Sequence, residues 1–154
     1  MRPRGRRLGC WLGLAVLVMA VVGGGIALQA PINAGLGRAT GSFAAATVSF
    51  AIGTVLLAAI VALSGRTGGI GEAAHVEWYY LLGGILGAAY VFSALVLVKE
   101  IGAGGVAAAT VTGQLATSVV LDRIGFLGLE EEPITAAKVL GVAFLLAGTY
   151  LVVR

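Results

Sequence analysis

Charged residues are scarce in this chain. Only 11% of its 154 residues are Asp, Glu, Lys or Arg, whereas a soluble domain carries about 25%. Hydrophobic residues make up 59% of the sequence, which is more than the core of a water-soluble protein of this size requires. The composition therefore excludes an ordinary soluble domain and indicates a chain that resides in lipid.

Cysteine and histidine are almost absent. The single cysteine, Cys10, excludes an internal disulfide and offers no metal pair, so we expect it to be a small helix residue. The single histidine, His75, lies between Glu72 and Glu77 without the spacing of a metal site, and we expect a solvated connection there. The sequence contains no Ser/His/Asp set, no paired carboxylates in its apolar runs and no phosphate-binding loop. It predicts no enzyme, no cofactor and no metal.

Long apolar runs occupy most of the chain. A helix needs about 20 apolar residues to cross about 30 Å of hydrocarbon. Five runs meet that length: 8–28, 43–64, 78–98, 104–121 and 134–153. Strict alternation over about ten residues, which is typical of barrel strands, appears in none of them. The predicted fold is all-α, a polytopic membrane protein with a bundle of five transmembrane helices, in which a tail, 1–7, precedes one domain, 8–154.

The first apolar run has two interpretations. Its arginine-rich start and the small residues at 27–30 are also typical of a signal peptide, whose removal would leave four spans. The run is longer than the usual signal segment of about 7 to 15 residues, and Cys10 lies at the start of the run and not after it, so it is not a lipoprotein cysteine. We therefore favour an uncleaved first helix. It ends near residue 28 or continues through Pro31 to about residue 36.

Basic residues predict the orientation, because cytoplasmic flanks collect Lys and Arg. With the N-terminus inside, seven of them are cytoplasmic: Arg2, Arg4, Arg6, Arg7, Arg66, Arg123 and Lys138. Three are outside: Arg38, Lys99 and Arg154. The count favours a cytoplasmic N-terminus and an outside C-terminus, and it explains the net charge of +3 without nucleic-acid binding. Without the four tail arginines the count is equal, so dual topology stays open.

Glycine is abundant, with 25 residues, which is about twice its usual share of roughly 7%. In lipid no hydrophobic force drives helices together, and small residues allow the close backbone approach that packs them. Glycines at helical spacing are candidates for such packing: Gly83, Gly87, Gly141 and Gly148. They predict either packing within the chain or a dimer face.

Polar residues inside the apolar runs are the candidates for function, since an unpaired amide in hydrocarbon is costly and tends to face a cavity or another helix. Gln29 and Asn33 are four residues apart and share a helix face if the first helix continues past Ala30. If that helix ends at Gln29, both amides lie in a wet turn instead.

Two further groups of polar residues lie in the third and fourth runs. Thr110, Gln114 and Thr117 form a polar stripe with Ser118 on an otherwise apolar helix, and Gln114 lies near its middle. Tyr90 and Ser93 place hydroxyl groups on the third run. Lining of a substrate path and hydrogen bonding between helices both explain these residues.

Several short strings follow one another in the order and spacing of a known family. They are 29–37 (QAPINAGLG), 48–53 (VSFAIG), 82–84 (LGG), 86–90 (LGAAY), 113–115 (GQL), 122–125 (DRIG) and the glycines of 141–148. From about Leu12 onward the chain resembles the YdcZ-like branch of the drug/metabolite transporter (DMT) superfamily. The resemblance implies a five-helix inner-membrane protein equivalent to half of a ten-helix EamA-like transporter.

The same resemblance implies a distant relation to the four-helix small multidrug resistance exporters. Those exporters use a glutamate in the first helix for proton coupling, whereas the first helix here offers Gln29 and Asn33, which do not titrate. Proton coupling by that route is therefore not expected.

The sequence and the resemblance together predict a small secondary transporter, an exporter of a small metabolite or drug-like compound. It would work by alternating access as an antiparallel dimer, either a homodimer or a heterodimer with a related five-helix protein. Its partners would be the lipid bilayer and a small-molecule substrate, and the residues expected to line the path are Gln29, Asn33, Tyr90 and Gln114. The alternative is an accessory membrane subunit that transports nothing. Substrate, direction and coupling ion stay open.

Overall fold

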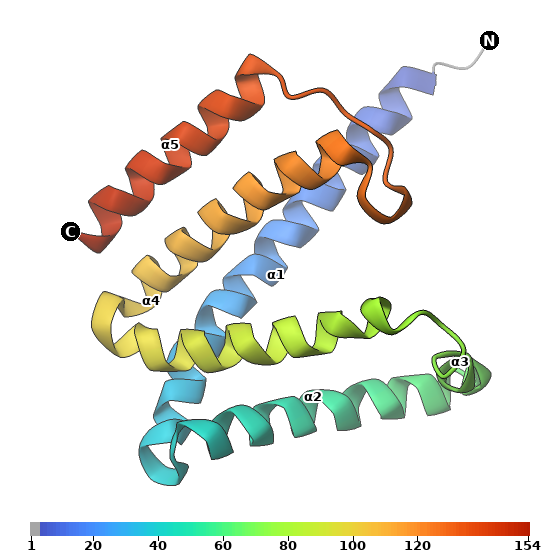
Figure 1. The fold of residues 1–154 in the computed structure, drawn as a ribbon, viewed down its shortest axis with the longest axis vertical. Coiled ribbons are helices and arrows are strands. Elements are labelled where there is room, and N and C mark those ends of the chain that lie inside the picture. The colour runs from blue at the N-terminus through green and yellow to red at the C-terminus, as the bar shows by residue number, and fades with distance from the viewer. Residues whose placement is uncertain (1–3) are drawn as a thin grey trace. The chain divides into compact units, whose positions relative to one another are not determined.

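The computed structural model describes residues 4–154, with side chains from Leu12 onward. In this part of the chain the regular elements are helices, without a strand: α1 (Arg4–Thr40), α2 (Ser42–Leu63), α3 (Gly68–Glu72), the 3-10 helix η1 (Trp78–Leu81), α4 (Leu82–Ile124), the 3-10 helix η2 (Phe126–Gly128) and α5 (Ala136–Val153) (Figure 1). The predicted all-α class is confirmed. Residues 1–3 and the side chains of residues 4–11 lie outside the described residues, and with them most of the predicted tail, 1–7, and the side chain of Cys10.

Four helical segments are long and apolar enough to cross a membrane: Leu12–Thr40, Ser42–Leu63, Trp78–Ile124 and Ala136–Val153. The five predicted runs fall within these four segments, because 78–98 and 104–121 share one segment of 47 residues. At 1.5 Å per residue this segment would be about 70 Å long, more than twice the thickness of the hydrocarbon core. The chain is a multi-pass membrane protein, and it reaches five crossings only if Trp78–Ile124 crosses twice.

Gly102 interrupts α4. Its φ of 72° and ψ of 169° lie outside the helical region, and this part of φ/ψ space is open essentially to glycine alone. A Cβ at this position would meet no described atom within 4 Å, so the requirement for glycine comes from the backbone conformation and not from crowding. The break divides α4 into a first segment, 82–101, and a second segment, 103–124, each close to the roughly 20 residues that cross a bilayer.

The first helix continues through Pro31 to Thr40, beyond the predicted limit of residue 36. Gln29 and Asn33 therefore belong to one helix and not to a turn. Proline has no N–H, so Pro31 removes the hydrogen bond that would otherwise reach the carbonyl of Ala27. The helix ends where Gly41, with φ 85°, redirects the chain into α2.

The last helix begins at Ala136, two residues later than predicted. Thr135 caps it, and the Thr135 Oγ1 accepts a hydrogen bond from the Lys138 backbone N–H at 3.2 Å. Pro133 thus precedes the helix and does not lie in its first turn, and the first turn holds no acidic residue.

The chain forms two compact units. The terminal unit comprises residues up to Gln29 together with Ala103–Arg154, and the central unit comprises Ala30–Gly102. In the central unit the buried side chains are small or medium in size: Ala30, Asn33, Ala34, Ala45, Val91, Ala94 and Leu95. A Cβ on Gly37 would lie 3.4 Å from Leu95 Cδ1, so α1 and α4 approach closely there. In the terminal unit, Val106, Thr112 and Val119 are buried. Most other large apolar side chains are exposed, as expected where lipid is the solvent.

Candidate functional site

The predicted path residues are divided between the two units. Gln29, Thr110, Gln114 and Thr117 belong to the terminal unit, and Asn33, Tyr90 and Ser93 belong to the central unit. In the terminal unit Gln29 and Thr110 are half-buried, whereas Gln114 and Thr117 are exposed. In the central unit Tyr90 is half-buried and Ser93 is exposed. A path lined jointly by these residues stays a prediction.

Asn33 is the most buried of the predicted residues, with an exposed fraction of 6%. Ala30 and Ala34 on the same side of α1 are also buried. Its amide has no hydrogen-bond partner among the described side chains and backbone, yet none of its polar atoms is fully sealed from the surface. A polar group of this kind is costly in hydrocarbon unless water or a ligand reaches it. Asn33 is therefore the best-supported candidate for contact with a polar group from outside its unit.

The terminal unit contains a hydroxyl pair that the sequence analysis missed. Thr112 on α4 is 5% exposed, and its Oγ1 lies 2.7 Å from the Oγ1 of Thr149 on α5. Both hydroxyls are also within reach of the Ala108 carbonyl, at 2.8 Å from Thr112 and 3.1 Å from Thr149. Each hydroxyl has one proton, so when one of them donates to the Ala108 carbonyl the other is free to donate across the pair. The pair links α4 to α5.

We expect Thr112→Val to weaken this link without affecting insertion, because valine keeps the shape of threonine but lacks the hydroxyl. Interhelical hydrogen bonds in membranes contribute about 0.6 kcal/mol on average and at most about 1.7 kcal/mol. Unfolding of the purified protein in mixed micelles should show a loss within that range. Thr117→Val, at an exposed position on the same helix, is the matched control and should leave stability unchanged.

The predicted packing glycines have different surroundings. A Cβ on Gly87 would lie 3.5 Å from Phe50 Cζ, so α4 approaches the Phe50 ring of α2 at this point. Open space surrounds the corresponding positions of Gly83, Gly141 and Gly148 among the described residues. Close packing through Gly83, Gly141 and Gly148 thus stays a prediction.

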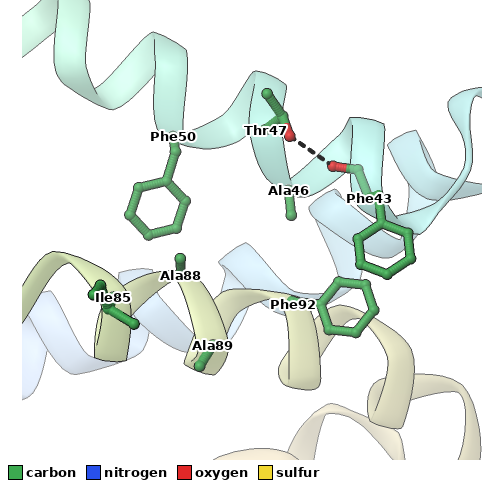
Figure 2. A pocket seen from close by; sticks show the side chains of 8 residues that line it. All are labelled: Phe43, Ala46, Thr47, Phe50, Ile85, Ala88, Ala89 and Phe92. Carbon is green, nitrogen blue, oxygen red and sulfur yellow. Dashed lines mark hydrogen bonds between the residues drawn. The ribbon is translucent and has the colours of Figure 1, made fainter.

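An apolar groove of about 620 Å³ lies between α2 and the first segment of α4, within the central unit. Its lining residues are Phe43, Ala46, Thr47, Phe50, Ile85, Ala88, Ala89 and Phe92. Figure 2 shows Phe50 and Ile85 at one end, Phe43 and Phe92 at the other, and the small side chains of Ala46 and Ala88 between them. A hollow of this volume is in the range of about 300 to 1,000 Å³ that is usual for small-molecule sites.

The groove offers almost no polar chemistry. None of its eight lining residues is charged, and Thr47 is the only one with a side-chain hydroxyl. Thr47 already donates that proton to the Phe43 carbonyl of its own helix at 2.9 Å (Figure 2). A molecule in the groove would therefore be held by apolar and aromatic contact.

Two aromatic rings close one end of the groove. The rings of Phe43 and Phe92 stack with centroids 4.5 Å apart and planes 18° from parallel. Phe43 is nevertheless 78% exposed, so much of its ring is free of contact with the chain. Sequence reasoning missed both residues, because a phenylalanine in an apolar run carries no mark that distinguishes it from the leucines around it.

Charged side chains gather between α4 and α5. The Lys138 Nζ lies 2.6 Å from Glu132 Oε2 and 3.8 Å from Asp122 Oδ2, and Arg123 lies 3.9 Å from Glu131. The hydrogen bond from Lys138 holds the pKa of Glu132 below its usual range. The pair of Lys138 and Glu132 joins the first turn of α5 to the connection that precedes this helix. Among the described residues, no group of His, Cys, Asp and Glu is arranged to hold a metal ion.

One comparison with known proteins gives a result. A model of the DMT_YdcZ family, described as "Putative inner membrane exporter, YdcZ", matches residues 14–151. Comparisons with curated proteins and with solved structures give no match. The family match includes all of α2 and α4, most of α1 and α5, and every residue of the groove. The chain therefore belongs to the DMT_YdcZ family, as its sequence motifs predict.

Proposed function

We propose that this protein is a secondary transporter that exports a small, largely apolar organic compound across the inner membrane. The observation that carries the proposal is the groove of about 620 Å³ between α2 and α4, which has the size of a small-molecule site and no charge in its lining. Membership of an exporter family supports the same conclusion.

The proposed transporter has five crossings, because the break at Gly102 divides the 47-residue segment into two lengths that each suit a bilayer. Five crossings place the two termini on opposite sides. An inverted partner then supplies the two-fold arrangement in the membrane plane on which alternating access depends in many transporters. This partner is a related five-helix protein if the wild-type chain inserts in one orientation, and a second copy if it inserts in both. The proposed working unit is an antiparallel dimer. One protomer has its N-terminus in the cytoplasm, and the inverted protomer has its N-terminus outside.

Asn33 and Gln114 are the proposed polar contacts of the substrate. The support differs for the two residues. Asn33 is 6% exposed, and its amide is not sealed from the surface. Gln114 is exposed on the second segment of α4. Both are uncharged, so they suit a hydrogen bond to a neutral substrate and not proton coupling.

The test is flux of a panel of small apolar compounds through the purified protein in liposomes. We expect Asn33→Leu and Gln114→Leu each to lower flux about tenfold or more, since roughly 1.4 kcal/mol of lost transition-state binding is already tenfold. Insertion and dimer content should be unchanged, because leucine is favourable in lipid. Thr54→Val, at an exposed position of α2 outside the groove and outside the predicted path, serves as the control and should retain full flux.

The competing function is that of an accessory subunit, and one observation favours it. Among the described residues, nothing lies within 4 Å of a Cβ placed on Gly83, Gly141 or Gly148, as expected for helix faces that a second protein covers. If no compound moves through the wild-type protein, or if both leucine variants keep full flux but lose the dimer, then the accessory role replaces the transport role.

A further inference from the structure

We propose that the groove between α2 and α4 is a binding site for neutral, planar aromatic molecules, with Phe43 and Phe92 as the residues that determine this specificity. The proposal rests on the proposed export function for its biological meaning. It rests on the groove alone for its chemistry.

Aromatic side chains are concentrated here. The chain has five phenylalanines, and three of them, Phe43, Phe50 and Phe92, line this one groove. Alanines lie between the aromatic ends, so the middle of the groove is left free for a ligand (Figure 2). Aromatic rings gain about 0.5 to 1.5 kcal/mol from stacked or edge-on pairing beyond the area that they bury. A planar ring in the groove could gain this pairing energy from Phe50 at one end and from Phe43 and Phe92 at the other.

The stacked pair shows how such a ligand would be held. Phe43 and Phe92 already lie nearly face to face at 4.5 Å, and the 78% exposure of Phe43 leaves its ring available to a further partner. A planar ligand can extend this stack into the groove. Because Phe43 lies in the first turn of α2, directly after the redirection of the chain at Gly41, the backbone fixes where the stack begins.

The charge of the ligand follows from the lining. None of the described residues that line the groove has a carboxylate or basic group, so an ionised ligand would lose hydration without gaining a counter-charge. A cation could gain about 0.5 to 2 kcal/mol from a ring face, but this is less than the cost of burying an unpaired ion. The groove therefore favours neutral aromatic molecules over anions and cations.

Lipid acyl chains are the natural competitor. An acyl chain is accommodated by any aliphatic surface, and the described helices expose many leucine, valine and isoleucine side chains. The groove offers an acyl chain little that those surfaces lack, whereas it offers an aromatic ligand three phenylalanine rings that an aliphatic surface does not have. We therefore assign the groove to an aromatic occupant and not to lipid.

The experiment measures binding of radiolabelled 2-naphthol to the full chain in lipid nanodiscs, with empty nanodiscs as the background for partition into lipid. We expect saturable binding to the wild-type protein. Phe43→Leu and Phe92→Leu should each weaken it about two- to tenfold, the range that corresponds to the loss of one aromatic pair. Phe144→Leu, which removes an exposed ring of α5 outside the groove, should leave binding unchanged. Phe43 is exposed, so its variant tests the idea even if Phe92→Leu fails to fold.

Three analogues test the stated chemistry. Naphthalene-2-sulfonate and trimethyl(2-naphthyl)ammonium should bind at least about tenfold more weakly than 2-naphthol, because each places an unpaired charge in the groove. The saturated decahydro-2-naphthol should bind about two- to tenfold more weakly, because it keeps the hydroxyl but loses the flat ring.

Equal binding of the saturated and aromatic alcohols would overturn the proposal, and so would unchanged binding in both phenylalanine variants. Displacement of 2-naphthol by a long-chain fatty alcohol at equal concentration would assign the groove to lipid instead. Binding that depends on Phe43 and Phe92 without any flux in liposomes would remove the export function but keep this site. Flux that is unchanged in both Phe43→Leu and Phe92→Leu would keep the export function but remove this site.

Discussion

Gly102→Ala is expected to be among the most damaging single substitutions in this chain. The backbone at Gly102 has φ 72° and ψ 169°, and a residue with a Cβ held in that region costs about 1 to 3 kcal/mol. The alternative for alanine is a helical conformation, which would join the two segments of α4 into one rod of about 65 Å. Such a rod exceeds the bilayer by a factor of two. We expect a lower yield of inserted protein and a lower unfolding midpoint in detergent.

Gly113→Ala is the matched control for this substitution. Gly113 lies in the second segment of α4 with helical backbone, and a Cβ there would also meet nothing within 4 Å. Alanine is favoured over glycine in a helix by about 1 kcal/mol, so this variant should be as stable as wild type or more stable. If both glycine variants had equal yield and equal midpoint, the break at Gly102 would not be what shapes α4.

The second large effect concerns orientation. Replacing Arg2, Arg4, Arg6 and Arg7 with glutamine is expected to change an outside C-terminus into a mixture of both orientations. The remaining basic residues are three on each side of five crossings, so the charge bias disappears. Alkaline phosphatase and green fluorescent protein fused after Val153 report the outside and the cytoplasmic C-terminus, respectively.

Arg38→Gln provides the control for orientation. Arg38 is exposed in the last turn of α1 and belongs to the outside set, so its loss should strengthen the original bias. A C-terminus that stayed entirely outside without the tail arginines would show that charge balance does not set the topology. A C-terminus found only in the cytoplasm of the wild-type protein would contradict the proposed five crossings or their direction.

The helices could be predicted from the sequence because hydrocarbon imposes a length and excludes charge. Four of the five predicted runs begin or end within a few residues of an element boundary or of the Gly102 break. The end of the first helix could not be predicted in this way, because Pro31 and the amides around it are compatible with a helix end. The structure continues α1 to Thr40, since a proline removes one hydrogen bond without ending a helix whose neighbours support it.

The packing faces could not be predicted in the same way. In water a helix shows its buried side by its apolar stripe, but in lipid both sides are apolar. The polar stripe of Thr110 and Gln114 was therefore expected to face a partner, whereas the hydroxyl that meets α5 belongs to Thr112, about half a turn away. The sequence also lacks any signal that Phe43 and Phe92, 49 residues apart, would stack.

Pro31 has a consequence for where water must be. Because the Ala27 carbonyl receives no proline N–H, one backbone acceptor within the candidate span Leu12–Thr40 lacks its regular donor. Pure hydrocarbon around that oxygen would cost several kcal/mol, so α1 cannot be surrounded by lipid tails on every side at this level. The helix must be hydrated or touched by a polar neighbour there, whatever side chains it carries. The backbone of α1 thus demands water or a polar neighbour near Ala27, six residues before Asn33.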